Sequence, residues 1–211
     1  ASPVGNGRYK IKGQKIFISG GQHDACENFV HLTLARIDGA PAGTKGISLF
    51  IIPKFLPQPD GSLKPNDAVC VGDFQKMGQR GYSTTHLAFG DHDQCIGWLV
   101  GEPHKGLSYM FQMMNEARIG VGQTAASVAM AAYQASLQYA QERPQGRLAS
   151  EKDPLKAPTL IINHPDVQRM LLTQKAIAEG ALSLAMECNR LYDLAHAASG
   201  DVQRKAWLLL E

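Results

Sequence analysis

The spacing of hydrophobic and polar residues divides the chain into two parts that meet near residue 103. In the first part, segments rich in Gly, Pro, Asp and Asn, such as DGAPAGTKG and PQPDGSLKPND, are typical of turns. Between them, short runs of β-branched and aromatic residues indicate strands. These runs lie at residues 29–36, 46–53, 68–71, 84–89 and 96–100. Closely spaced strands without helical patterns between them predict a small antiparallel barrel or sandwich over residues 1–102.

The second part, residues 103–211, has helical periodicity. The stretch from Leu107 to about Gln141 is rich in Ala, Met, Leu and Gln and contains no proline, which predicts one long helix. A second helix is expected to begin at Pro165 and to carry apolar residues at helical spacing. We expect Gly200 to end it and Asp201 to cap a third helix.

These two patterns together predict an α+β fold with two domains. A strand-rich domain, residues 1–102, is followed by an incomplete antiparallel helical bundle, residues 103–211, with a long loop at 147–162.

The stretch GQKIFISGG, residues 13–21, has a strand pattern with one irregularity. Ile16 and Ile18 alternate with polar neighbours, but Phe17 places an apolar side chain on the opposite face. Gly20 and Gly21 then leave room for another backbone or a flat ligand. A buried strand ending in a glycine turn explains the same pattern, so the residues alone leave both interpretations open.

Composition excludes several classes of protein. The net charge is +2, from 21 basic and 19 acidic residues, which argues against nucleic acid or an anionic membrane as the main partner. No apolar run approaches the roughly 20 residues that span a bilayer. Four cysteines without CxxC spacing suit apolar packing in a reducing compartment, so a cytoplasmic protein without a metal site is expected. The opening ASPVGNGRYK lacks an initiating Met and a signal peptide, which indicates part of a longer polypeptide.

Several short motifs have ordinary explanations. GVGQTA (120–125) fits a dinucleotide fingerprint, but it falls inside a predicted helix and offers no free helix N-terminus for a phosphate. We expect its glycines to allow close packing of the helix instead. DHD (91–93) and GQHD (21–24) lack a second cluster of metal ligands and are interpreted as loops.

Three arginines keep two interpretations each. Arg118 follows a mainly apolar helical face, where a cation is either solvated or paired with an anionic ligand. Arg143 and Arg147 in ERPQGR suit phosphate binding, but basic residues also commonly complement a helix C-terminus.

Five segments, taken in order, resemble the acyl-CoA dehydrogenase family. They are KIFIS, MGQRGYSTTHLAFGD, IGWLVGEPHKGLSYMFQMMNEARIGVG, QYAQERPQGR and NHPDVQRMLL. The resemblance covers essentially the whole chain, from the family's middle β-domain into its C-terminal helical bundle. It is most similar to the larger branch, which includes 3-methylthiopropanoyl-CoA dehydrogenases.

The resemblance implies a set of binding residues. Phe17 and Ile18 would form a flat apolar wall for the flavin of FAD, and the Ser19 hydroxyl would bond near the reactive flavin nitrogen. Arg118 and Asn115 would contact the acyl-CoA. The FAD pyrophosphate of a neighbouring subunit would be held by Arg143, Gln145 and His164, which implies a homodimer or homotetramer.

The resemblance also implies the chemistry. A carboxylate removes the α-proton of an acyl-CoA thioester, the β-hydrogen leaves as hydride to FAD, and the electrons pass to an electron-transfer flavoprotein. Some family members carry the base just before the arginine of the first long helix, but Ala117 stands there, and Glu116 is turned away by about 100°. We therefore expect the base beyond Glu211 and an inactive isolated chain.

Two rival hypotheses remain at this point. One is a non-catalytic relative that binds flavin and nucleic acid, which a large basic patch would favour. The other is a helical interaction module, which leaves the co-occurrence of KIFIS, Arg118 and Arg143 unexplained.

Overall fold

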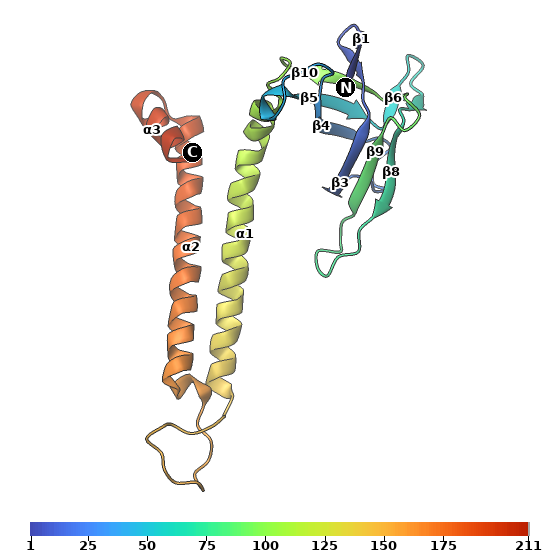
Figure 1. Cartoon of the computed structure of the whole chain (residues 1–211). Coiled ribbons are helices and arrows are strands. Elements are labelled where there is room, and N and C mark those ends of the chain that lie inside the picture. Colours follow the sequence, from blue (N-terminus) through green and yellow to red (C-terminus); the bar gives the residue numbers. More distant parts are fainter. Residues whose placement is uncertain (211) are drawn as a thin grey trace. The chain divides into compact units, whose positions relative to one another are not determined.

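Ten strands occupy the first 100 residues of the computed structural model, which describes residues 1–210 of the chain (Figure 1). They are β1 Ser2–Gly5, β2 Arg8–Lys10, β3 Gly13–Ser19, β4 Val30–Arg36, β5 Ile47–Pro53, β6 Phe55–Pro57, β7 Leu63–Pro65, β8 Ala68–Asp73, β9 Thr84–Phe89 and β10 Ile96–Val100. A single 3₁₀ turn, η1 Thr44–Gly46, precedes β5. The predicted strands are all present, and β1, β2, β6 and β7 are short additions.

The described strands form three antiparallel sheets. One sheet has the order β1-β2-β10-β5-β4, a second has the order β3-β9-β8, and β6 pairs with β7. The α+β class is therefore confirmed. A closed barrel is wrong, because β3 and β4 each end a sheet without pairing with one another.

The two larger sheets share one hydrophobic core. Phe50 and Ile52 of β5 lie in the same buried cluster as Leu87 and Phe89 of β9, together with Cys95 before β10. Asn66 is also buried there, and its side-chain amide donates to the carbonyls of Pro53 (2.7 Å) and Ile96 (2.8 Å). Because side chains of both sheets meet in one core, the arrangement is that of a sandwich.

Three α-helices follow the strands: α1 Gly106–Glu142, α2 Pro165–Ala197 and α3 Gly200–Leu210. A 3₁₀ turn, η2 Ile161–Asn163, precedes α2, which begins at Pro165, as predicted. Asp166 lies beside it in the first turn. The chain divides into two compact units, Ala1–Met113 (the strand unit) and the residues from Met114 onward (the helical unit).

Within the helical unit, α1 and α2 run antiparallel. Tyr133 and Ala140 of α1 pack with Leu171 of α2, and Gln123, nearer the start of α1, meets Asn189 near the end of α2 at 3.5 Å. The short α3 packs on the end of α2 through Ala206, which shares a cluster with Leu191 and Ala195.

Two details of the helices differ from the predictions. The second helix ends at Ala197, and Gly200 begins α3 with φ 63° instead of ending α2. Gly120 and Gly122 lie inside α1, which excludes the dinucleotide loop, but a Cβ added at either would meet no atom within 4 Å. Close packing at these glycines is therefore wrong for the described chain.

Candidate functional site

The irregularity in GQKIFIS is a β-bulge. Lys15 pairs with Leu87 and Ile18 pairs with Thr85, so β3 has one more residue than β9 between these two pairs. Phe17 lies inside the bulge with φ 58°, a left-handed conformation that is rare for a bulky residue. The apolar residue that broke the sequence alternation is therefore the one that the bulge turns out of the ladder.

Phe17 and Ile18 have different surroundings. The Phe17 side chain is 65% exposed, and its ring contacts that of Phe74 with centroids 4.7 Å apart and planes tilted by 40°. Ile18 is half-buried and packs against the core cluster. A single apolar surface made of both side chains stays a prediction. Phe74 joins the candidate residues, although no sequence motif points to it.

Ser19 and the two glycines lie beside a cleft of about 420 Å³ within the strand unit. Ile18, Ser19, Gly20 and Gly21 line one part of it, residues 29–34 another, and Leu87, Phe89 and Met110 contribute further apolar surface. The Ser19 hydroxyl makes no hydrogen bond with any described residue. The structure thus brings Ile18 and Ser19 to the same cleft.

The glycines have a structural reason of their own. Gly20 has φ 63° and donates its N–H to the carbonyl of Ser83 at 2.8 Å, which closes the turn after β3. A Cβ on the buried Gly21 would lie 2.1 Å from the Thr85 hydroxyl oxygen, closer than any real contact. The glycine pair is therefore explained by the turn and by packing against β9.

His31, on β4, lines the same cleft. Its ring makes an edge contact with Phe89, with centroids 5.7 Å apart. Burial, and secondarily the positive charge of Lys54, lowers its pKa. The imidazole is therefore neutral at neutral pH, and the cleft carries no positive charge at this position.

Arg143, Gln145 and His164 come together where α1 ends and α2 begins. The Ile161 N–H donates to the Arg143 carbonyl (2.9 Å), and the Gln145 N–H donates to the Thr159 carbonyl (2.8 Å). His164 Nε2 lies 2.8 Å from the Gln145 carbonyl oxygen, so this nitrogen carries the proton. These contacts fix the backbone of the three residues against one another.

The two arginines of ERPQGR have different roles. Arg147 donates from Nε to the Lys156 carbonyl (2.7 Å) and from Nη2 to the Pro154 carbonyl (2.5 Å), so its guanidinium holds the loop that follows. The exposed side chain of Arg143 has no hydrogen bond or ion pair with any described residue. Of the two, Arg143 has the guanidinium that is free to bind an anion.

Asn115 and Arg118 lie on α1, three residues apart, and both are exposed. Residues at this spacing share one face of a helix. Glu116, also exposed, is rotated from Asn115 by one helical step of about 100°. The helix therefore presents the amide and the guanidinium together and turns the neighbouring carboxylate aside.

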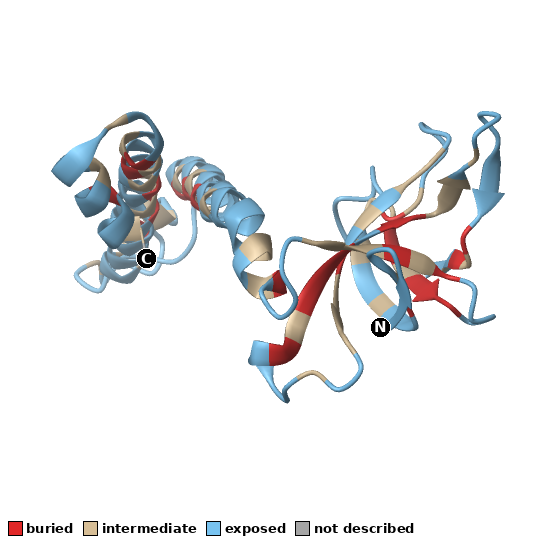
Figure 2. Ribbon diagram, turned by 90° about the horizontal axis from the view of Figure 1, so that it is seen from above, coloured by how far each residue is buried: buried red, intermediate tan, exposed pale blue. Residues whose placement is uncertain are grey.

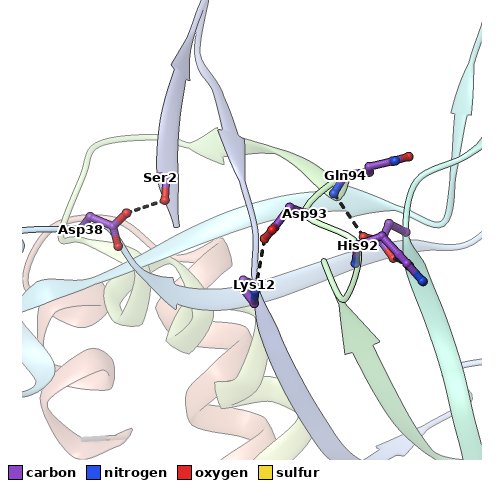
Figure 3. A network of polar contacts seen from close by, with 7 residues as sticks. Ser2, Lys12, Asp38, His92, Asp93 and Gln94 are labelled. Atoms are coloured by element: carbon purple, nitrogen blue, oxygen red, sulfur yellow. Dashed lines mark hydrogen bonds and ion pairs between the residues drawn. The ribbon is translucent and has the colours of Figure 1, made fainter.

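The DHD motif belongs to a structural polar network (Figure 3). Asp67 accepts hydrogen bonds from the backbone N–H groups of His92 (2.8 Å) and Gln94 (3.2 Å) and lies 3.0 Å from His92 Nδ1. Asp93 pairs with Lys12 at 3.2 Å. The hydrogen bond between the side chains of His92 and Asp67 raises the pKa of His92 and lowers the pKa of Asp67. These residues fix the turn before β10.

Residues 1–210 contain no group of three or more His, Cys, Asp or Glu side chains arranged to hold a metal ion. None of the described helices is both long enough and apolar enough to cross a membrane.

Comparisons with known proteins identify the family of this chain. Residues 104–204 match the family described as acyl-CoA dehydrogenase, C-terminal domain. Over 94% of its length the chain is 42% identical to a butyryl-CoA dehydrogenase of Syntrophomonas wolfei. Over its whole length it is 41% identical to 3-methylmercaptopropionyl-CoA dehydrogenase of Ruegeria pomeroyi. The chain belongs to the acyl-CoA dehydrogenase family.

A solved structure shares the fold. The crystal structure of an acyl-CoA dehydrogenase from Bacillus anthracis, complexed with FAD, superposes on 96% of this chain with a TM-score of 0.65 at 23% identity. The chain covers 30% of that protein and spans about one third of the length of the two curated relatives, 33% and 35%.

Proposed function

We propose that the natural protein containing these residues is an FAD-dependent acyl-CoA dehydrogenase that oxidises the α,β-bond of an acyl-CoA thioester. The observation that carries the proposal is the end of β3, where a bulge exposes the Phe17 ring two residues before the unpaired hydroxyl of Ser19. The names of the relatives support the activity.

The described residues fit FAD. A planar, largely apolar ring system suits the exposed aromatic ring of Phe17 and the apolar surface that Ile18 adds beside Ser19. The Ser19 hydroxyl would supply a hydrogen bond to the flavin. The Arg143 guanidinium, which has no protein partner among the described residues, suits a pyrophosphate, with Gln145 and His164 beside it.

FAD, when bound, supplies the hydride acceptor of this reaction. The chain's own residues bind and orient. Asn115 and Arg118 offer an amide and a guanidinium on one face of α1 for the acyl-CoA, and Ser19 holds a proton at its hydroxyl toward the flavin. We assign the general base to no described residue, because Glu116 is turned away from the face of Asn115 and Arg118.

Several wider features belong to the same proposal. The two curated relatives are named for different acyl groups, butyryl and 3-methylmercaptopropionyl, so the acyl chain is left open.

We propose an electron-transfer flavoprotein as the electron acceptor, and a homodimer or homotetramer in which Arg143 reaches the FAD of a neighbouring subunit. The four cysteines are unpaired, which suits a reducing compartment and supports a cytoplasmic location.

The decisive experiment is the visible spectrum of the natural full-length protein before and after anaerobic addition of an acyl-CoA panel. A flavin band that bleaches with one or more of these thioesters is the expected result. Absence of a flavin band after purification in the presence of FAD would overturn the cofactor assignment. A band that no acyl-CoA bleaches would instead favour a non-catalytic relative.

Arg143 and Arg147 offer a matched pair of variants. Arg143→Ala is expected to lower flavin retention on dialysis, because it removes the guanidinium proposed to hold the pyrophosphate. Arg147→Ala removes an equal charge four residues away, but this guanidinium is occupied by the Pro154 and Lys156 carbonyls. Equal flavin retention in both variants would remove Arg143 from the cofactor site.

A further inference from the structure

We propose that Phe74 is a positioning residue for the flavin: it holds the Phe17 ring in place and so completes an aromatic platform at the end of the β3-β9-β8 sheet. The proposal rests on the proposed function, since it takes the planar ring of FAD as the group that meets Phe17. Nothing in the sequence motifs points to Phe74; the contact across the sheet does.

The backbone fixes where Phe74 lies. Phe74 directly follows β8, and its N–H donates to the Thr84 carbonyl of β9 at 2.7 Å. The preceding residue, Asp73, accepts from the Thr84 N–H at 2.8 Å through its side chain. Two hydrogen bonds therefore tie this end of β8 to the start of β9, and the Phe74 side chain is placed by them.

Phe17 needs such a support. The bulge in β3 gives Phe17 φ 58° and leaves its side chain 65% exposed, so the strand ladder does not hold the ring. The Phe74 ring lies 4.7 Å away, within the range of favourable aromatic pairs, and is itself half-buried. Phe74 thus covers part of Phe17 and leaves the rest open to a planar group.

The contact is not required to close the hairpin between β8 and β9. Within that hairpin, Lys76 Nζ donates to the Tyr82 carbonyl at 2.8 Å and lies 3.4 Å from the centroid of the Tyr82 ring. Arg80 Nε donates to the Lys76 carbonyl at 2.7 Å. The hairpin has internal contacts of its own, so the Phe17–Phe74 pair is free to serve the surface that it exposes.

The test compares three variants of the natural full-length protein, loaded with FAD. Phe74→Leu keeps apolar volume but removes the ring, Phe74→Tyr keeps the ring, and Phe55→Leu is a control at another half-buried phenylalanine, on β6. We expect Phe74→Leu to raise the dissociation constant for FAD about 2- to 10-fold, the range of an aromatic pair. Its bound-flavin fluorescence should also rise, while the other two variants match wild type.

A double-mutant cycle with Phe17→Leu separates support from mere proximity. If Phe74 acts through Phe17, the double variant loses no more FAD affinity than Phe17→Leu alone. Additive losses, or a Phe74→Leu variant with wild-type affinity and fluorescence, would overturn the proposal. If Phe74→Leu does not fold, as judged from thermal melting of the apo-protein, Phe74→Met takes its place in the cycle.

The failure of this inference is distinguishable from failure of the proposed function. A wild-type protein that binds no flavin removes the function before any variant is made. A wild type that binds flavin and bleaches with acyl-CoA, combined with no effect of Phe74→Leu, leaves the function in place and removes Phe74 from it.

Discussion

Figure 2 shows that the strand unit and the helical unit both contain buried residues. The two units bury different kinds of side chain. In the strand unit the buried cluster includes Phe50, Ile52, Leu87 and Phe89, each at most 4% exposed. In the helical unit most buried apolar residues are alanines: Ala126, Ala140, Ala178, Ala185, Ala195 and Ala206. The strand unit therefore has a core of large side chains, and the helices meet mainly through small ones.

Many large apolar residues of α2 and α3 are nevertheless exposed. On α2, Leu172, Ile177, Leu184 and Met186 are 64–67% exposed, and on α3 Leu208 and Leu209 are 65% and 70% exposed. A helix with apolar residues on more than one side is typical of one that is covered on several sides. These exposed side chains support the proposed oligomer, because they offer apolar surface on the helices for further contacts.

The largest effect is expected in the core of the strand unit. Phe50 is fully buried and makes an edge contact with Tyr9, with ring centroids 5.1 Å apart. Phe50→Ala should lower the free energy of unfolding by about 3–5 kcal/mol, through lost burial and a cavity that the sheets cannot close. Urea denaturation measures this. The fully exposed Met77 provides the control, since Met77→Ala should change stability by no more than about 0.5 kcal/mol.

Two neighbouring leucines on α2 test which side of this helix is packed within the chain and which side is available for further contacts. Leu171 is 8% exposed and packs with Tyr133 and Ala140, so Leu171→Ala should cost about 2–4 kcal/mol in urea denaturation. Leu172 is 67% exposed, and Leu172→Ala should leave the stability of the isolated chain nearly unchanged. In the natural protein Leu172→Ala should instead weaken self-association, measured by sedimentation. Equal oligomer dissociation constants for wild type and variant would show that this face is not an interface.

Substitutions at two glycines, one in each unit, are expected to change stability by smaller amounts. Gly21→Ala should destabilise the strand unit by about 1–3 kcal/mol, because the new methyl group meets the Thr85 hydroxyl, which itself donates to the Ile18 carbonyl. Gly120→Ala should stabilise α1 by about 1 kcal/mol in the isolated chain, since no atom lies within 4 Å of its Cβ. Thermal melting checks both. A destabilising Gly120→Ala would mean that this face of α1 is covered.

Much of the fold was predictable because local patterns control it. Pro165 marks the start of α2, and runs of β-branched and aromatic residues place β4, β5 and β9 within one or two residues. Whether the sheets close into a barrel was not predictable. Closure depends on whether two edge strands meet, which no local pattern encodes. The short β1, β2, β6 and β7 are held by pairing with partners, so their own residues give little signal.

Some features of the candidate site were likewise predictable from the sequence and others were not. The break in alternation at Phe17 was visible in the sequence, and the bulge is its structural cause. Phe74 was not predictable, because it meets Phe17 only through the pairing of β3 and β8 with the same strand. The distinction between Arg143 and Arg147 also needed the structure, since the loop carbonyls that bind Arg147 come from residues 154 and 156.

The smallest expected effect concerns ion pairs, which also differ between the units. In the helical unit the Lys175–Glu179 and Glu187–Arg190 pairs are exposed and one helical turn apart, a geometry that contributes little. In the strand unit Asp67 has a side chain only 6% exposed and binds His92 together with two backbone N–H groups. The His92–Asp67 pair should therefore give the strand unit a pH dependence that the helical pairs do not.

The sign of that dependence follows from the two pKa directions. The hydrogen bond that the Asp67 carboxylate accepts from His92 raises the pKa of His92 above its ordinary 6.5, so the stabilisation is full below pH 6.5 and is lost as pH rises through the raised value. The hydrogen bond from His92 lowers the pKa of Asp67 below 3.8, so its contribution is lost as pH falls through the lowered value. The pair is strongest between pH 3.8 and 6.5.

His92→Gln should therefore lower the melting temperature more at pH 5.5 than at pH 8.5. The control is His104→Asn, at an exposed histidine whose φ of 68° asparagine tolerates, and it should give the same small change at both pH values. A pH-independent effect of His92→Gln would mean that packing of the turn, and not the ionic hydrogen bond, accounts for the contribution of His92.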